Sequence, residues 1–154
     1  MATHIDILAV GALSGDLKPV FAHYARLLTP VCDLGVREVR EYALQGRAAE
    51  AVLRDEGRRL LAAWPRRGVV VALVVTGVER DSPGLAASLQ GWLARGAVTF
   101  VIGGSLGLAP EVLARADEQL SLSRLTLPHQ LARVVLAEQV FRALKIARRE
   151  PYHH

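Results

Sequence analysis

Residues 100–154 read FVIGGSLGLAPEVLARADEQLSLSRLTLPHQLARVVLAEQVFRALKIARREPYHH. This pattern predicts a buried strand, a Gly-Gly turn, a short helix, a short strand, a loop ending in Thr-Leu-Pro-His, a long apolar helix and a basic tail. Two turns rich in backbone groups thus lie close in sequence, beside a helix too apolar to face water. The arrangement favours a nucleotide-like cofactor held by main-chain groups, in a pocket completed by a partner surface.

The bulk composition is that of one domain, residues 1–154, large enough to bury a core without metals or disulfides. No apolar run reaches the roughly 20 residues that span a bilayer, and the N-terminus lacks the features of a signal peptide. The single cysteine, Cys32, cannot form an internal disulfide, so we expect a cytoplasmic protein. The net charge of +4 weakly favours an anionic partner.

Apolar runs and amphipathic segments alternate along the chain. We expect an α/β fold in which a parallel sheet lies between two layers of helices, with ligands bound at the carboxyl ends of the strands. We expect the first helix to be capped by Ser14 and Asp16. The expected strands are residues 5–11, 36–42, 69–75, 98–102 and 119–123, and the expected helices are residues 14–28, 46–64, 82–95, 110–116 and 128–147.

Two segments could hold the cofactor. Gly103 and Gly104 would let backbone amides approach a ligand, although the two glycines taken alone favour the simpler explanation of a tight strand-to-helix turn. In the loop at 122–127, leucines could sandwich an adenine ring whose edge bonds to main-chain groups; alternatively, Thr126 only caps the next helix. A G-x-G-x-x-G dinucleotide motif, a G-x-S-x-G nucleophile motif and zinc-ligand spacing are all absent from the sequence, so we expect no metal.

The last predicted helix is apolar around most of its circumference, and we expect part of it to meet a second subunit in a two-fold dimer. Arg142 lies four residues after Glu138 and could pair with it, or it could face an RNA phosphate or base. Basic residues gather at 58–59, at 66–67 and in the tail from Lys145 to Arg149, either as solvated helix ends or as contacts for an anionic partner.

The chain as a whole resembles the small SPOUT-class RNA methyltransferases. Within that class it is similar to the bacterial family that methylates N3 of a pseudouridine in large-subunit ribosomal RNA. The segments that carry the resemblance are IDILAVG at 5–11, LRDEGRRLLA at 53–62, IGG at 102–104, SLSRLTLPH at 121–129, RVVLAEQVFRALKI at 133–146 and PYH at 151–153.

The resemblance implies a C-terminal trefoil knot, S-adenosylmethionine as cofactor, a homodimer, and ribosomal RNA, in assembled ribosomes, as substrate. It implies that Tyr152 and His153 act at the active site, and to these two catalytic candidates we add Arg142 as a group that could stabilise the anionic ring. Where family members often carry acidic residues, this chain has Val74 and Leu106, so those positions receive no polar role. The cofactor-binding residues that it implies are Leu73, Gly103, Gly104, Leu122, Ser123, Arg124, Leu125, Thr126 and Leu127.

Two alternative functions remain open from sequence. One is a methyltransferase of the same fold that acts on transfer RNA. The other is a ribosome-binding factor that keeps the fold without catalysis.

Overall fold

The computed structural model describes residues 3–152 and contains a five-stranded parallel sheet. The order across the sheet is β2-β1-β4-β3-β5, so the chain crosses from one side of β1 to the other after β2. The α/β prediction with a parallel sheet is confirmed. The strands are β1 (His4–Val10), β2 (Asp33–Val39), β3 (Val69–Glu79), β4 (Val98–Ile102) and β5 (Glu118–Ser121).

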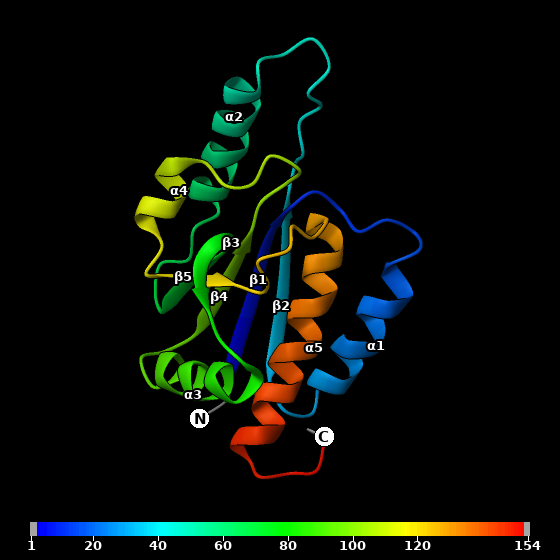
Figure 1. Ribbon diagram of the computed structural model, residues 1–154, viewed down its shortest axis with the longest axis vertical. Coiled ribbons are helices and arrows are strands. Elements are labelled where there is room, and N and C mark those ends of the chain that lie inside the picture. The colour runs from blue at the N-terminus through cyan, green and yellow to red at the C-terminus, as the bar shows by residue number, and fades with distance from the viewer. Residues whose placement is uncertain (1–2, 153–154) are drawn as a thin grey trace.

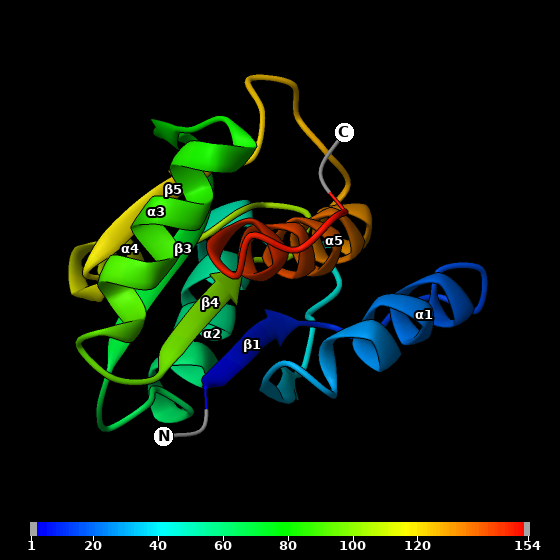
Figure 2. The same cartoon turned by 90° about the horizontal axis from the view of Figure 1, so that it is seen from below.

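Helices cover both faces of the sheet, as predicted (Figures 1 and 2). The odd-numbered residues of β1 and β4's Phe100 pack under α1, α3 and α5, while Leu8, Val10 and Val101 pack under α2 and α4. Figure 1 shows α5 running beside α1 from the top of the sheet to the bottom. The helices are α1 (Lys18–Leu28), α2 (Ala49–Ala62), α3 (Ser82–Leu93), α4 (Pro110–Arg115) and α5 (His129–Ala147).

The start of α1 differs from the prediction. Ser14 and Asp16 do not cap the helix, which begins at Lys18 without a side-chain cap. Instead, the carbonyl oxygen of Ser14 accepts hydrogen bonds from the backbone N–H groups of Leu17 and Lys18, both at 3.1 Å. A turn therefore occupies the residues that the capping pattern assigned to the helix.

Four of the five strands also have bounds that differ from the prediction, and the shift is largest in β2 and β3. We expected residues 36–42 in the second strand, but β2 is Asp33–Val39, because it pairs residue for residue with His4–Val10 of β1. We expected the third strand to end at residue 75, but β3 continues to Glu79 beyond an irregularity in its pairing with β5. The close approach of β3 to β5 requires a glycine at position 77. A Cβ there would lie 2.8 Å from the backbone of residues 119 and 120 and would clash with it.

The side chain of Arg133 ties α5 to the first two strands. It is only 1% exposed, and it donates one hydrogen bond to the Gly11 carbonyl oxygen at 2.8 Å and another to the Glu38 carboxylate. Gly11 follows β1 and Glu38 lies in β2, so one guanidinium fixes the start of α5 over the carboxyl ends of both strands. The periodicity of the helix does not indicate a buried charge.

Much of the apolar surface of α5 is covered by the chain itself. Val134, Leu136, Val140, Phe141 and Leu144 are buried, and α5 packs against both α1 and α3. The apolar circumference therefore does not by itself require a second subunit. The less buried side chains form a stripe at i, i+4, i+7 and i+11, which we call the outer stripe of α5: Leu131, Val135, Glu138 and Arg142.

Candidate functional site

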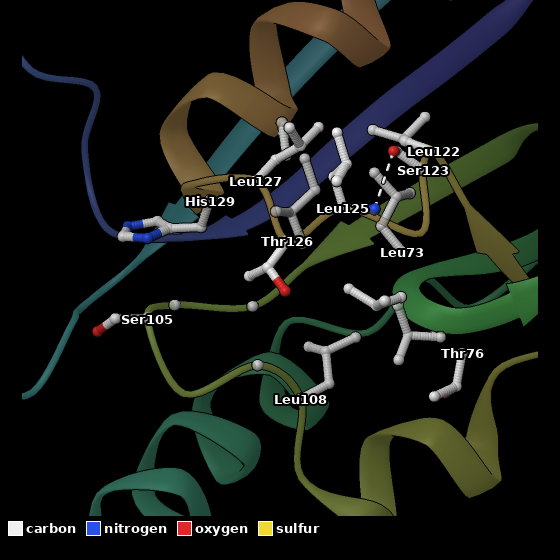
Figure 3. Close-up of a pocket in the computed structure, with 17 residues that line it drawn as sticks. Leu73, Thr76, Ser105, Leu108, Leu122, Ser123, Leu125, Thr126, Leu127 and His129 are labelled. Carbon is white, nitrogen blue, oxygen red and sulfur yellow. Dashed lines mark hydrogen bonds between the residues drawn. The ribbon is translucent and has the colours of Figure 1, made fainter.

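A cavity of about 240 Å³ opens at the carboxyl ends of the central strands. Its walls come from the end of β3, the turn after β4, the loop between β5 and α5, and the first turn of α5 (Figure 3). These segments are far apart in sequence, and the parallel topology brings them to one edge of the sheet. The position agrees with the expectation for a parallel sheet.

The turn after β4 forms the floor of the cavity from main-chain atoms. Gly103 and Gly104 are both buried and both line it. A Cβ at Gly103 would lie 2.2 Å from the carbonyl oxygen of Gly107, so no side chain fits there unless the turn opens. Gly107 has φ +82°, which glycine adopts without strain. Because of these glycines the turn is tight, and it presents main-chain atoms rather than side chains to the cavity.

The loop after β5 supplies the apolar wall. Figure 3 shows Leu73, Leu122, Leu125 and Leu127 gathered on one side of the cavity, with Leu108 opposite them. The hydroxyl of Ser123 accepts a hydrogen bond from the Leu125 N–H at 3.0 Å, which shapes the loop. Flat apolar rings could be held between such walls.

Eight of the nine residues expected to bind the cofactor line this cavity. The exception is Arg124, whose side chain is 87% exposed and pairs with Glu79 at 3.2 Å. Sequence reasoning did not assign Thr76, Ser105, Leu108, His129 or Ala132 to the cofactor site, although these residues also line the cavity. Ser105 and His129 lie within two positions of the expected segments, so a small extension of those segments would have found them. Thr76, Leu108 and Ala132 lie three to five positions away, and only the fold brings them to the cavity.

The cavity carries little charge. Among the described residues that line it, His129 has the one ionisable side chain. Its Nε2 atom is buried, lacks a hydrogen-bond partner and lies 3.6 Å from Oε1 of Glu41. The site is therefore suited to a ligand recognised chiefly by shape and by main-chain hydrogen bonds.

A buried carboxyl group lies behind the glycine turn. Glu56 of α2 is 3% exposed, and its Oε2 accepts a hydrogen bond from the Tyr42 N–H at 3.1 Å. Its Oε1 is buried without a partner, and a Cβ at Gly104 would lie 3.1 Å from it. Burial, which disfavours the charged form, raises the pKa of Glu56, and the nearby Glu41 adds to this effect.

Two of the three expected catalytic residues, Arg142 and Tyr152, lie together near the end of α5. Arg142 donates to Oε1 of Glu138 at 2.6 Å, its guanidinium stands 4.9 Å from the Tyr152 ring centroid, and the Tyr152 hydroxyl lies 3.3 Å from the same Oε1. The hydrogen bond that Arg142 donates to Glu138 raises the pKa of Arg142, and burial raises the pKa of Tyr152. Both groups are therefore protonated at neutral pH. His153 lies outside the described residues.

Within one chain, the described part of the tail, up to Tyr152, does not reach the cavity. Arg142 is 13 residues beyond His129 on a helix that rises 1.5 Å per residue, which separates them by about 20 Å. Arg148 donates to the carbonyl oxygen of Val31 at 3.2 Å, just before β2 begins. The tail thus lies at the amino edge of the sheet, opposite to the cavity.

In the described part of the chain, no group of three His, Cys, Asp or Glu residues could hold a metal ion. No helix there is long and apolar enough to cross a membrane.

The raised pKa of Glu56 predicts a pH-dependent stability. Between the ordinary glutamate pKa of about 4.3 and the raised folded-state value, the folded chain keeps a proton that the unfolded chain has released. The contribution of this proton to the free energy of unfolding is complete below about pH 4, and it is lost as pH rises through the pKa of Glu56 in the folded chain. Glu56→Gln, which keeps the acceptor for Tyr42, should therefore be stabilised relative to wild type at pH 8 by about 1 kcal/mol, and less at pH 4.

Denaturant unfolding at the two pH values measures this difference. Glu50→Gln, on the exposed first turn of the same helix, is the control and should change little with pH. An equal effect of Glu56→Gln at both pH values would mean that the carboxyl is not perturbed by burial.

Comparison with known proteins places the chain in a family. Residues 3–153 match the family model described as "Predicted SPOUT methyltransferase". The chain is 43% identical to "Ribosomal RNA large subunit methyltransferase H" of Ligilactobacillus salivarius, over 97% of this chain and 99% of the relative. It is 43% identical to the protein of the same name from Burkholderia multivorans, over 96% of each.

Solved structures share the fold at low sequence identity. A probable methylase family protein from Haemophilus influenzae aligns with all of this chain and 72% of its own, at a TM-score of 0.58 and 12% identity. A probable methyltransferase from Bordetella pertussis aligns with 92% of this chain and 95% of its own, at a TM-score of 0.58 and 15% identity. The family match covers nearly the whole chain, and the resemblance noted in the sequence is confirmed: the chain belongs to the SPOUT methyltransferase family.

Proposed function

We propose that this protein transfers a methyl group from S-adenosylmethionine to N3 of a pseudouridine in large-subunit ribosomal RNA. The observation that carries the proposal is the cavity, which gathers eight residues that family resemblance assigns to the cofactor. The name shared by the close relatives supports the RNA substrate.

The cavity suits the cofactor in chemistry and in size. Its apolar walls and main-chain floor match an adenosine group, which offers a flat ring and a hydrogen-bonding edge. The volume of about 240 Å³ is slightly below the roughly 300–1,000 Å³ typical of ligand pockets, so the remainder of the cofactor would extend toward the open side. When bound, the cofactor supplies an electrophilic methyl group on a sulfonium sulfur.

The nucleophile of the proposed reaction, N3 of a uracil-type ring, determines which catalytic groups the protein must supply. N3 of a uracil-type ring carries a proton, which must leave for the nitrogen lone pair to attack. A base or a cation that stabilises the anionic ring lowers that barrier, and alignment with the methyl group contributes further. We assign anion stabilisation to Arg142, whose guanidinium stays charged, and proton transfer or orientation to His153, with Tyr152 beside them.

The distance between the tail and the cavity supports a homodimer. Since α5 holds Arg142 about 20 Å from the cavity of its own chain, we propose that the tail of one subunit closes over the cavity of the other. The outer stripe of α5 offers Leu131 and Val135 for such an interface. Leu125, 73% exposed at the cavity rim, offers a further apolar surface.

We further propose that the C-terminal segment is threaded as a trefoil knot. Two features support it: β5 lies at the opposite end of the sheet from β2, yet α5 returns to lie against both α1 and α3. The loop between β5 and α5 makes this return, and it lies across the cavity from the glycine turn.

We extend the proposed substrate to ribosomal RNA within the assembled ribosome, since residues 3–152 form one α/β unit and contain no second unit that could bind free RNA. Such a substrate would place the protein in the cytoplasm. Deleting the gene should remove one methyl group from large-subunit RNA, and mapping modified positions in ribosomal and transfer RNA measures this. Loss of a transfer RNA modification instead would contradict the proposed substrate.

Filling the cavity should abolish cofactor binding. Gly103→Val is a poor test, because its Cβ would strike the Gly107 backbone and distort the turn. Ala132→Leu adds bulk from the rigid α5 wall and should weaken S-adenosylmethionine binding at least tenfold by calorimetry, with little change in melting temperature. Ala87→Leu, on an exposed position of α3, is the matched control. Unchanged affinity of Ala132→Leu would remove this cavity from the cofactor site.

The tail should act in the chemical step on the partner's cavity. Deleting residues 151–154 should leave dimerisation and cofactor affinity nearly intact and reduce methyl transfer to ribosomes by at least about 100-fold, because the deletion removes an interaction made only in the transition state. Mixing this variant with Ala132→Leu should restore activity, since a mixed dimer has one intact cavity facing one intact tail. No recovery, with subunit exchange verified by mass spectrometry, would mean that the tail does not act across the dimer.

A further inference from the structure

Three arginines surround one tyrosine ring beside the cavity. The guanidinium carbons of Arg47 and Arg59 lie 5.2 Å from the ring centroid of Tyr42, and that of Arg40 lies 5.8 Å away. Arg59 also donates a hydrogen bond from Nε to the Tyr42 hydroxyl at 2.7 Å. We call these four residues the Tyr42 arginine cluster.

The cluster is only partly neutralised by the chain. Arg47 pairs with Asp55, and that hydrogen bond holds the pKa of Asp55 below its usual range. Asp55 is also shared with Arg58 at 4.0 Å. The other acidic side chains nearby are Glu50, exposed on the first turn of α2, Glu41, which lies beside His129, and Glu56, which is buried.

Arg40 and Arg59 are exposed and make no ion pair within the described part of the chain. A guanidinium bound over an aromatic face still presents N–H groups at its edge. Gathering like charges costs electrostatic energy that a polyanion would relieve. The arrangement therefore favours an anionic partner over the solvated helix end that remained open from the sequence.

Two interactions connect the cluster to the cavity. The backbone N–H of Tyr42 binds Glu56, which lies directly behind Gly104 of the glycine turn. The neighbouring Glu41 approaches His129, which lines the cavity. Figure 1 shows that the loop between β2 and α2 extends beyond the carboxyl edge of the sheet, where the cavity opens. A nucleic acid that passes over this loop can place a base at the cavity.

We propose that the Tyr42 arginine cluster binds the phosphate backbone of the RNA whose base is methylated. The inference rests on the proposed function for the identity of the RNA. Arginine suits this task because its planar fork bonds two phosphate oxygens at once. Such interactions position the nucleic acid without reading its sequence, and their strength depends on salt.

The test compares two double variants with equal change of charge. Arg40→Gln/Arg59→Gln removes the two unpaired cations and keeps a hydrogen-bond donor near the Tyr42 hydroxyl. Arg66→Gln/Arg67→Gln is the matched control: it removes two exposed arginines between α2 and β3, where the chain approaches the amino edge of the sheet. Equilibrium binding to unmethylated large ribosomal subunits is measured at low and at high KCl concentration, along with melting temperature and S-adenosylmethionine affinity.

We expect Arg40→Gln/Arg59→Gln to bind the subunits at least about tenfold more weakly, with a salt slope shallower by roughly 0.7 to 0.9 for each phosphate that is no longer neutralised. Cofactor affinity and melting temperature should match wild type, and the control should keep the wild-type slope. Equal affinity and slope in both variants, or an equal loss of affinity in both, would overturn the proposal. Wild type that binds subunits through this cluster but transfers no methyl group would overturn the proposed function and leave the surface assignment standing.

Discussion

The buried guanidinium of Arg133 is the group on which the geometry of the site depends. Removing an arginine from water costs several kcal/mol unless its hydrogen bonds are replaced, and here Glu38 and the Gly11 carbonyl replace two of them. Because these partners stand at the ends of β1 and β2, the first turn of α5 can occupy only one place. His129 and Ala132 on that turn line the cavity, so a pairing outside the cavity determines the shape of one wall.

The opposite wall depends on the absence of side chains. A Cβ at Gly103 would strike the Gly107 backbone, so this turn requires glycine there, whereas a Cβ at Gly104 would push against the Glu56 carboxyl. Because this wall consists of main-chain atoms, many substitutions at nearby positions leave its shape unchanged. Leu106, where the family often has an acid, does not line the cavity, and Val74 lines it as an apolar residue. These departures therefore leave a cavity of the expected composition.

Hydrophobic runs and turn residues in the sequence predicted those parts of the structure that depend on neighbouring residues alone. β4 has the predicted bounds, and the glycine turn and the leucine loop meet because parallel strands end at one edge. The predicted bounds of β2 and β3 were wrong because pairing partners, not alternation, fix a strand's length. Arg133 and Glu56 were missed for a related reason: helical periodicity assigns a charged residue to solvent, and only the tertiary structure supplies partners that make burial tolerable.

The length of α5 then divides the protein's functional groups between two edges of the sheet. The cavity and the Tyr42 arginine cluster lie at the carboxyl edge, whereas Arg142 and Tyr152 lie near the amino edge, held there by Glu138 and Phe141. A helix of 19 residues anchored by the buried guanidinium of Arg133 cannot bend to bring the two sets together. If both sets act on one nucleotide, the second must come from another copy of the chain. In such a dimer, each RNA strand would meet cations of both subunits, one group holding its backbone and the other its reacting base.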